Sequence, residues 1–291
     1  MRKLRNKLLL SILTVALTFI ALGTTTFAWF TLGGEATANA FTAQVKTPDG
    51  IEISLDETNW SNSVTLTAAE GLKFLDITTE DGINFVDKSG EETTGTYFTD
   101  IICVRTTNPN VTVSLEQLII DESNFFEASE DVTGNWISDI AFGTFEANNS
   151  YIFNAINAVR VSFVKGQTAQ VLEIEGENNH GSADNSEAGL TWKYAVAKKA
   201  ESTISADLKS GEFTLPEIAA KVDTDGTFKD EAEVVLLEGS EFVQNGDYYY
   251  TEFTINVWLE GWDADCINAI LNGQVTLGFK LSADFETPEG E

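Results

Sequence analysis

Histidine, cysteine, proline and methionine are all scarce in this sequence of 291 residues, which has one His, two Cys, four Pro and one Met. The common catalytic triads and two-histidine zinc sites need histidine, and the single His180 lies in a polar stretch between Asn and Gly. Neither an HExxH nor a GxSxG motif is present. These absences predict a protein that is not an enzyme and that needs no cofactor.

Basic residues are also scarce, with 17 Lys and Arg against 46 Asp and Glu, for a net charge of −29. Nucleic acids and anionic lipid surfaces both require cationic patches on a protein, so this charge argues against either as a partner. The hydrophobic fraction of 43% is too high for a disordered chain. We therefore expect a folded, acidic protein that is soluble and able to attract divalent cations.

Only the N-terminus carries a long apolar run, over residues 8–22, and four cations precede it: Arg2, Lys3, Arg5 and Lys7. Three threonines follow the run, and then a small-residue step that ends at Ala28. This order is typical of a secretory signal peptide over residues 1–28, cut by a signal peptidase between Ala28 and Trp29. The alternative is a retained membrane anchor over residues 8–30. The predicted location is secreted, either extracellular or at the cell surface.

Alternation with a period of two dominates the rest of the chain. In residues 249–259 and 275–285, every second residue is mostly apolar, as in strands with one buried face. Further strands are expected at residues 51–55, 64–66, 97–107, 111–115 and 159–163. Short helices are expected only at residues 215–222 and 265–271. This pattern predicts an all-β fold, an antiparallel β-sandwich (jelly-roll-like) with short helices and long loop insertions.

The predicted organisation has three parts. The signal peptide (1–28) is followed by an extended N-terminal segment (29–45) and then by the sandwich domain (46–288). Within the domain, residues from about 166 to 246 are polar and charged, and we expect a polar insertion of long loops there.

Two groups of residues are candidates for ligands or cross-links. Carboxylate oxygens, which calcium prefers, cluster in one acidic stretch at Asp223, Asp225, Asp230 and Glu231. The spacing is not that of an EF-hand, and an ordinary acidic turn is the alternative. Cys103 and Cys266 are an even pair in a chain predicted to be exported, so they form either one disulfide or two buried thiols.

Two tryptophans suggest a surface contact. Trp258 falls on the polar phase of its predicted strand, and Trp262 falls in the turn that follows. These two are therefore the better candidates for an exposed contact patch that could stack on sugar, and the alternative is that they are core residues, as aromatics in β-proteins more often are. This patch supports an alternative function, a carbohydrate-binding or adhesive surface module with a glycan as partner.

The exit from the signal peptide, Thr24-Thr25-Thr26-Phe27-Ala28-Trp29-Phe30-Thr31, resembles the cleavage region of a class of exported proteins in Gram-positive bacteria. These proteins use the SipW-type signal peptidase and include the TasA and camelysin-like biofilm matrix family. The segment 257–266 also resembles the closing part of such proteins. The resemblance covers both ends of the chain and leaves its middle unmatched.

The resemblance implies a function and a set of partners. Family members are jelly-roll subunits that polymerise by donating an N-terminal strand to a neighbour. This chain would then be a secreted, non-enzymatic structural protein of the cell surface or biofilm matrix and a fibre subunit. Its partners would be other copies of itself, in a homopolymer, or other matrix proteins, and Trp29–Val45 would be the donor strand.

Overall fold

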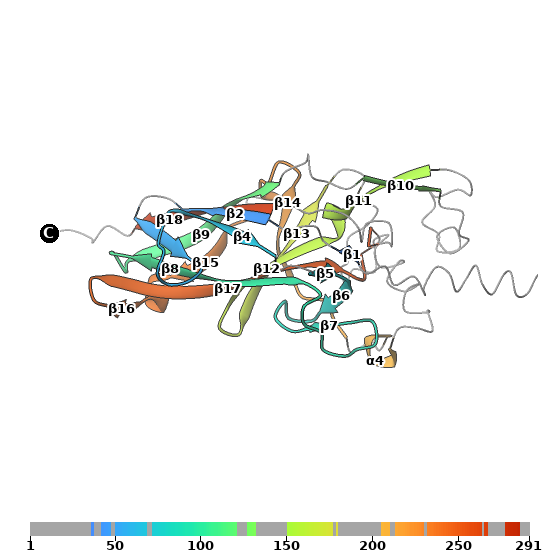
Figure 1. The fold of residues 1–291 in the computed structure, drawn as a ribbon, viewed down its shortest axis with the longest axis horizontal. Helices are drawn as coiled ribbons and strands as arrows, with labels where there is room; N and C mark the ends of the chain where they lie inside the picture. The colour runs from blue at the N-terminus through green and yellow to red at the C-terminus, as the bar shows by residue number, and fades with distance from the viewer. Residues whose placement is uncertain are drawn as a thin grey trace, which may run out of the picture. The chain divides into compact units, whose positions relative to one another are not determined.

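Two large β-sheets make up most of the structure, a computed structural model (Figure 1). It describes residues 36–37, 42–47, 50–68, 72–120, 127–131, 150–176, 179, 205–209, 213–229, 232–263, 265–266 and 277–285. Side chains from both sheets share one hydrophobic core, so the described part of the chain is an all-β sandwich, as the alternation predicted.

The smaller of the two sheets has five strands. In spatial order they are β15 (Val234–Glu238), β9 (Val111–Ile120), β18 (Leu277–Phe285), β2 (Thr42–Lys46) and β4 (Ser63–Thr67). All neighbours are antiparallel except β18 and β2, which run parallel. A β-bulge at Glu116 shifts the phase of β9, so that Leu115 and Leu118 both face the core.

The larger sheet has nine strands. A path of six runs through β14 (Ile218–Asp223), β13 (Thr168–Glu175), β12 (Val159–Lys165), β17 (Tyr248–Glu260), β6 (Asp76–Thr79) and β7 (Phe85–Val86). The other three are β8 (Phe98–Thr106) and β16 (Val243–Asn245), which pair with β17, and β3 (Ile51–Ser54), which pairs with β8. The β13–β14 and β17–β6 pairs are parallel, so the sheet is mixed and not purely antiparallel.

The remaining elements are short. Two small sheets pair β1 (Ala36–Thr37) with β5 (Lys73–Phe74) and β10 (Glu127–Asp131) with β11 (Ser150–Asn154). The helical turns are η2 (Ala155–Ala158), α4 (Ala206–Lys209) and η4 (Gly239–Glu241). The helix expected at residues 215–222 is wrong, because Ile218–Asp223 is strand β14.

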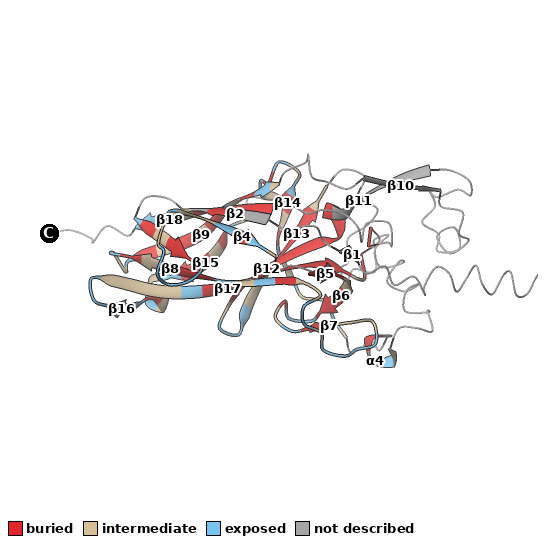
Figure 2. Ribbon diagram, in the orientation of Figure 1, coloured by how far each residue is buried: buried red, intermediate tan, exposed pale blue. Residues whose placement is uncertain are grey.

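The core between the sheets is built from the apolar phases of the strands. Phe163 of β12 meets Phe253 in its own sheet, with ring centroids 6.0 Å apart, and Phe279 of the opposite sheet at 5.4 Å. Figure 2 shows the buried positions concentrated in the strands of the two sheets, while the β16–β17 hairpin is mainly intermediate or exposed. The predicted strands at 51–55, 64–66, 111–115 and 159–163 are all present.

A second apolar cluster covers the outer face of the nine-stranded sheet. Trp258, Ile77, Phe85 and Val171 are its buried members, each at most 2% exposed. The loop before β7 lies on this face at Gly82, whose carbonyl accepts hydrogen bonds from Ser162 Oγ (2.6 Å) and Asn256 Nδ2 (3.2 Å). Gly82 has φ of +72°, and a Cβ atom there would lie 2.7 Å from Val171 Cγ2, so the loop needs glycine to lie this close.

The expected polar insertion at residues 166–246 is wrong over much of its length. Strands β13, β14 and β15 all fall inside it and contribute buried residues to the core, among them Leu172, Ile174, Val222 and Leu237. Their charged neighbours, such as Glu173 and Lys221, form ion pairs with one another and with Arg160. In the described strands of this stretch, the charged residues therefore form ion pairs within the sheet and do not mark loops.

Candidate functional site

The predicted contact patch at Trp258 and Trp262 is wrong, because both side chains are buried, at 0% and 5% exposure. Trp258 packs against Phe85, with ring centroids 5.0 Å apart, and Trp262 packs against Leu208. The alternation in β17 predicts one side that faces the core and one side that faces solvent. The β6–β7 region covers that second side, so the polar phase at Trp258 faces protein instead of water.

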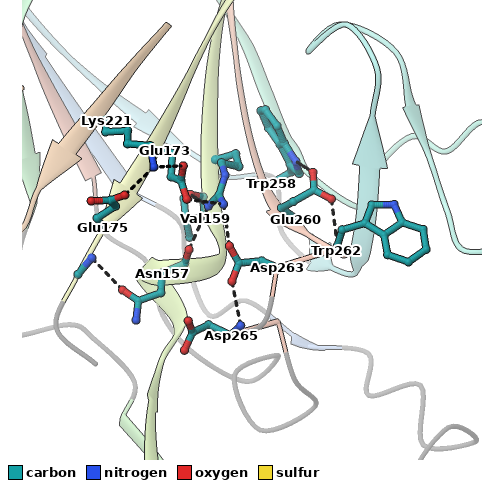
Figure 3. Close-up of polar contacts among 12 residues, drawn as sticks. Asn157, Val159, Glu173, Glu175, Lys221, Trp258, Glu260, Trp262, Asp263 and Asp265 are labelled. Atoms are coloured by element: carbon teal, nitrogen blue, oxygen red, sulfur yellow. Dashed lines mark hydrogen bonds and ion pairs between the residues drawn. The ribbon is translucent and has the colours of Figure 1, made fainter. Parts of the chain in front are cut away.

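A buried ion network lies next to these tryptophans, centred on Arg160 of β12 (Figure 3). Arg160 is 1% exposed, and its Nη2 donates to Glu173 Oε1 at 3.0 Å and to Asp263 Oδ2 at 2.6 Å. Its Nη1 donates to the carbonyls of Asn157 (3.0 Å) and Val159 (3.1 Å). Hydrogen bonds from one guanidinium thus link strand β12 to strand β13, to the turn after β17 and to the η2 turn.

Carboxyl groups outnumber cations in this network. Four of them are at most 2% exposed, namely Glu173, Glu260, Asp263 and Asp265, while Arg160 is the only fully buried cation of the described residues there. Lys221 contributes from the edge, with its Nζ 3.5 Å from Glu173 Oε2. Since charge without compensation is costly in a protein interior, some of these carboxyls must hold protons.

Two carboxyls show this effect in their pKa. The pKa of Asp263 is raised to about 8, chiefly by burial; Arg160 opposes the rise, and the nearby Asp265 and Glu173 add to it. Burial also raises the pKa of Glu260, although the Trp262 N–H and the Trp258 indole N–H both donate to its oxygens, each at 3.1 Å. The network thus links parts of the fold, with its excess negative charge neutralised by protonation, and is not a metal site. No group of three or more His, Cys, Asp or Glu in the described part of the chain could hold a metal ion.

The sequence contained a signal for this network that the prediction missed. Arg160 is a lone cation inside an apolar strand, and its direct register partners are Glu173 on β13 and Trp258 on β17. Opposite charges facing each other on adjacent strands stabilise a pair, but the pairing of β12 with β13 had first to be known.

The two cysteines are buried thiols and do not form the disulfide that was one of the two alternatives. Cys266 follows the turn at Asp263 and belongs to the main core, where its N–H donates to the Asp263 carbonyl at 3.2 Å. Cys103 of β8 lies outside that cluster. Burial, followed by the charges of Glu57 and Glu252, raises the pKa of the Cys103 thiol, which keeps it protonated and unreactive.

The acidic stretch predicted to bind calcium is described only at Asp223 and Asp225. Asp223 Oδ1 lies 3.0 Å from Lys229 Nζ, and Asp225 Oδ1 accepts from the N–H (2.9 Å) and hydroxyl (2.6 Å) of Thr227. In these contacts, both carboxylates bind to residues of the same turn, the one that follows β14. The other two candidates, Asp230 and Glu231, lie outside the described residues, so calcium binding by the four together stays a prediction.

The N-terminal segment completes the chain's own five-stranded sheet. Strand β2 lies between β18 and β4, with five registered residue pairs to β4 and two to β18. Val45 is 0% exposed and belongs to the main core. Among the described strands, β4 pairs only with β2. The position of β2 is therefore a slot: without this strand, β18 would present an open edge and β4 would have no partner among the described strands.

The cleavage site at Ala28 and Trp29 lies outside the described residues. No protein-family model, curated protein or solved structure matches the chain. Among the described helices, none is long and apolar enough to cross a membrane.

Proposed function

We propose that the chain is a secreted, non-enzymatic structural protein of the cell surface or matrix, and that its copies associate by exchanging strand β2. The observation that carries this proposal is the slot between β18 and β4, which β2 of the same chain fills. A strand from a second copy would find the same backbone partners and the same core position for Val45. Exchange of this kind creates almost no new contacts and is a low-cost route to assembly.

The connection that would open is short. It runs over residues 47–50 between β2 and β3 and includes Pro48. Short connections of this kind favour exchange between copies over closure on the same copy. Because each copy gives one strand and receives another from a different neighbour, the association does not close and extends into a filament.

The acidic charge and the N-terminal sequence support the location. A chain with a net charge of −29 repels other copies through most of its surface, so a specific strand exchange would have to supply the attraction. Residues 1–28 have the order of a signal peptide, and removal of that segment would leave the region before β2 as the start of the mature chain.

The test compares the mature chain, beginning at Trp29, with a chain beginning at Thr47 that keeps the slot but has no strand to donate. Negative-stain electron microscopy should show filaments for the first and none for the second. When the two are mixed, the shorter chain should cap growing ends and shorten the filaments in proportion to its share. Circular dichroism checks that the shorter chain is folded.

Two results would overturn the proposal. Filaments of normal length from the chain beginning at Thr47 alone would show that β2 is not the exchanged element. Failure of the mature chain to assemble at any concentration would contradict the proposed structural role itself.

A further inference from the structure

A surface groove of about 660 Å³ lies beside β4, an edge strand of the described five-stranded sheet, and shares no lining residue with the buried network. Residues of the loop 55–61, among them Trp60, line it together with Arg105. Hydroxyl and amide groups line most of the remainder, from Thr58, Asn59, Ser61, Ser63 and Thr65. The groove thus presents one aromatic ring, one guanidinium and one carboxylate among neutral hydrogen-bonding groups.

The ring of Trp60 is held in a fixed orientation while it stays partly exposed. Its Nε1 donates to the Glu57 carbonyl at 3.0 Å, and the guanidinium carbon of Arg105 lies 4.5 Å from the ring centroid. Tyr250 meets the indole edge-on, with centroids 5.6 Å apart. A ring already fixed in place loses little entropy when a ligand stacks on it.

Arg105 is itself held in place. Its guanidinium carbon lies 4.2 Å from the ring centroid of Tyr248, and its Nε donates to Glu52 Oε2 at 2.7 Å. The Glu52 carboxylate balances the charge of Arg105, so the groove is not a strong anion site. With the strongly acidic charge of the whole chain, this balance disfavours polyanions as ligands.

The loop wall is shaped by Asp56. Its Oδ1 accepts from the N–H groups of Thr58 (2.9 Å) and Asn59 (2.7 Å), and its Oδ2 accepts from Asn59 Nδ2 at 2.6 Å. These bonds, led by those from Asn59, hold the pKa of Asp56 well below its usual range. Of the residues that the structure describes, Asp56 is the one carboxylate that lines the groove. Glycoside hydrolysis needs two, one of them protonated, so the groove is suited to binding a glycan and not to cleaving it.

We propose that this groove binds a neutral polysaccharide, with one sugar ring stacked on the face of Trp60 opposite Arg105 and its hydroxyls bonded to the Ser and Thr side chains along β4. An aromatic surface with a few convergent polar groups is the usual make-up of a small-ligand site. An extended peptide pairing with the free edge of β4 is less favoured, because strand addition gains its specificity from apolar pockets for alternate side chains. In this groove Leu55 and Val64 are the only aliphatic lining residues. Glycan binding would be independent of strand exchange.

The experiment is native affinity electrophoresis of the mature protein, at a concentration below assembly, in gels that contain laminarin, hydroxyethyl cellulose or dextran. A fourth gel contains polygalacturonate as an anionic probe. At least one neutral polysaccharide should slow the protein, and polygalacturonate should not. Trp60→Ala should weaken the binding at least tenfold, and Trp60→Phe should retain part of it. The matched control is Phe285→Ala, which removes a ring that is 37% exposed on β18, away from the groove lining, and should leave the binding unchanged.

Several results would overturn the proposal. They are no retardation by any of the three neutral polysaccharides, equal retardation of the Trp60→Ala variant, or retardation by polygalacturonate alone. A synthetic peptide of residues 36–46 that binds in a Trp60-dependent manner, with no polysaccharide binding, would assign the groove to strand addition instead. Thermal melting of each variant checks that the fold is intact.

Discussion

Arg160 and Arg105 stand on strands of the same sheet, yet their surroundings differ in kind. Arg160 is 1% exposed, and carboxyl and carbonyl oxygens accept from its guanidinium. The Arg105 side chain is 18% exposed, pairs with one carboxylate at the surface and lies over two aromatic rings. The first arginine has no route to a ligand and holds the sheet together. The second leaves rings and hydroxyls open to solvent, where a ligand can bind.

The largest expected effect comes from breaking the buried network. Arg160→Ala leaves Glu173 and Asp263 buried without their cation, and should lower the free energy of unfolding by about 3–5 kcal/mol. Arg105→Ala is the matched control, and because its ion pair is at the surface it should cost less than about 1 kcal/mol. Urea unfolding measures both. Equal losses in the two variants would show that the network contributes no more than the surface pair.

The covered face of the nine-stranded sheet gives a second contrast, between Gly82 and Gly95. Both have positive φ, +72° and +75°, but only at Gly82 would a Cβ meet a close neighbour. Gly95→Ala should therefore cost only the backbone strain of about 1 kcal/mol, while Gly82→Ala adds about 1–3 kcal/mol from overpacking. Thermal melting of both variants measures the difference. If the two melt together, the loop at Gly82 does not lie against Val171.

The smallest expected effect is a dependence on pH. The pKa of Asp263 is about 8 in the folded protein and lies above its ordinary value of 3.8. At a pH between these two values the carboxyl group is therefore protonated in the folded state and ionised in the unfolded state. Its contribution to stability is complete below the unfolded pKa and is lost as pH rises through about 8. The melting temperature should therefore fall between about pH 5 and pH 9.

Asp263→Asn is the variant that tests this pH dependence, because it removes the titrating proton and should flatten the fall in melting temperature. Asp247→Asn, in the exposed turn before β17, is the control and should leave the fall unchanged. A fall that is as steep in Asp263→Asn as in the unchanged chain would assign the pH dependence to other groups.

The parts of the fold that the sequence predicted are those in which one strand face meets the core and the other meets water. The clearest case is β9, whose burial alternates over residues 111–115 as its sequence does. The Val159–Lys165 strand was also predicted, although the structure buries both of its faces. The prediction failed where a second layer covers the outer face. Nothing in the alternation of β17 shows that Gly82 lies against Asn256 and Phe85 against Trp258, because these contacts join segments far apart in the chain.

Charge misled the prediction in the same way. The acidic character of Glu173 and Glu175 suggested loops, while in the structure β13 is a strand whose carboxylates pair with Arg160, Lys221 and Lys229. The place of β2 in its own sheet was also beyond the sequence, because its partners β4 and β18 are separated by most of the chain. Local patterns identify strands, but they do not identify partners.

Strand exchange is tested most directly by fixing β2 to its own chain. Gln44 and Thr65 are register partners across β2 and β4, so Gln44→Cys with Thr65→Cys should form a disulfide that keeps β2 in its own slot. Ser114→Cys with Ser282→Cys is the control, because it joins β9 to β18 without holding β2. Under oxidising conditions the first variant should stay monomeric and the control should form filaments, and after reduction both should assemble. Filaments from the oxidised Gln44–Thr65 variant, as long as those of the control, would contradict the exchange of β2.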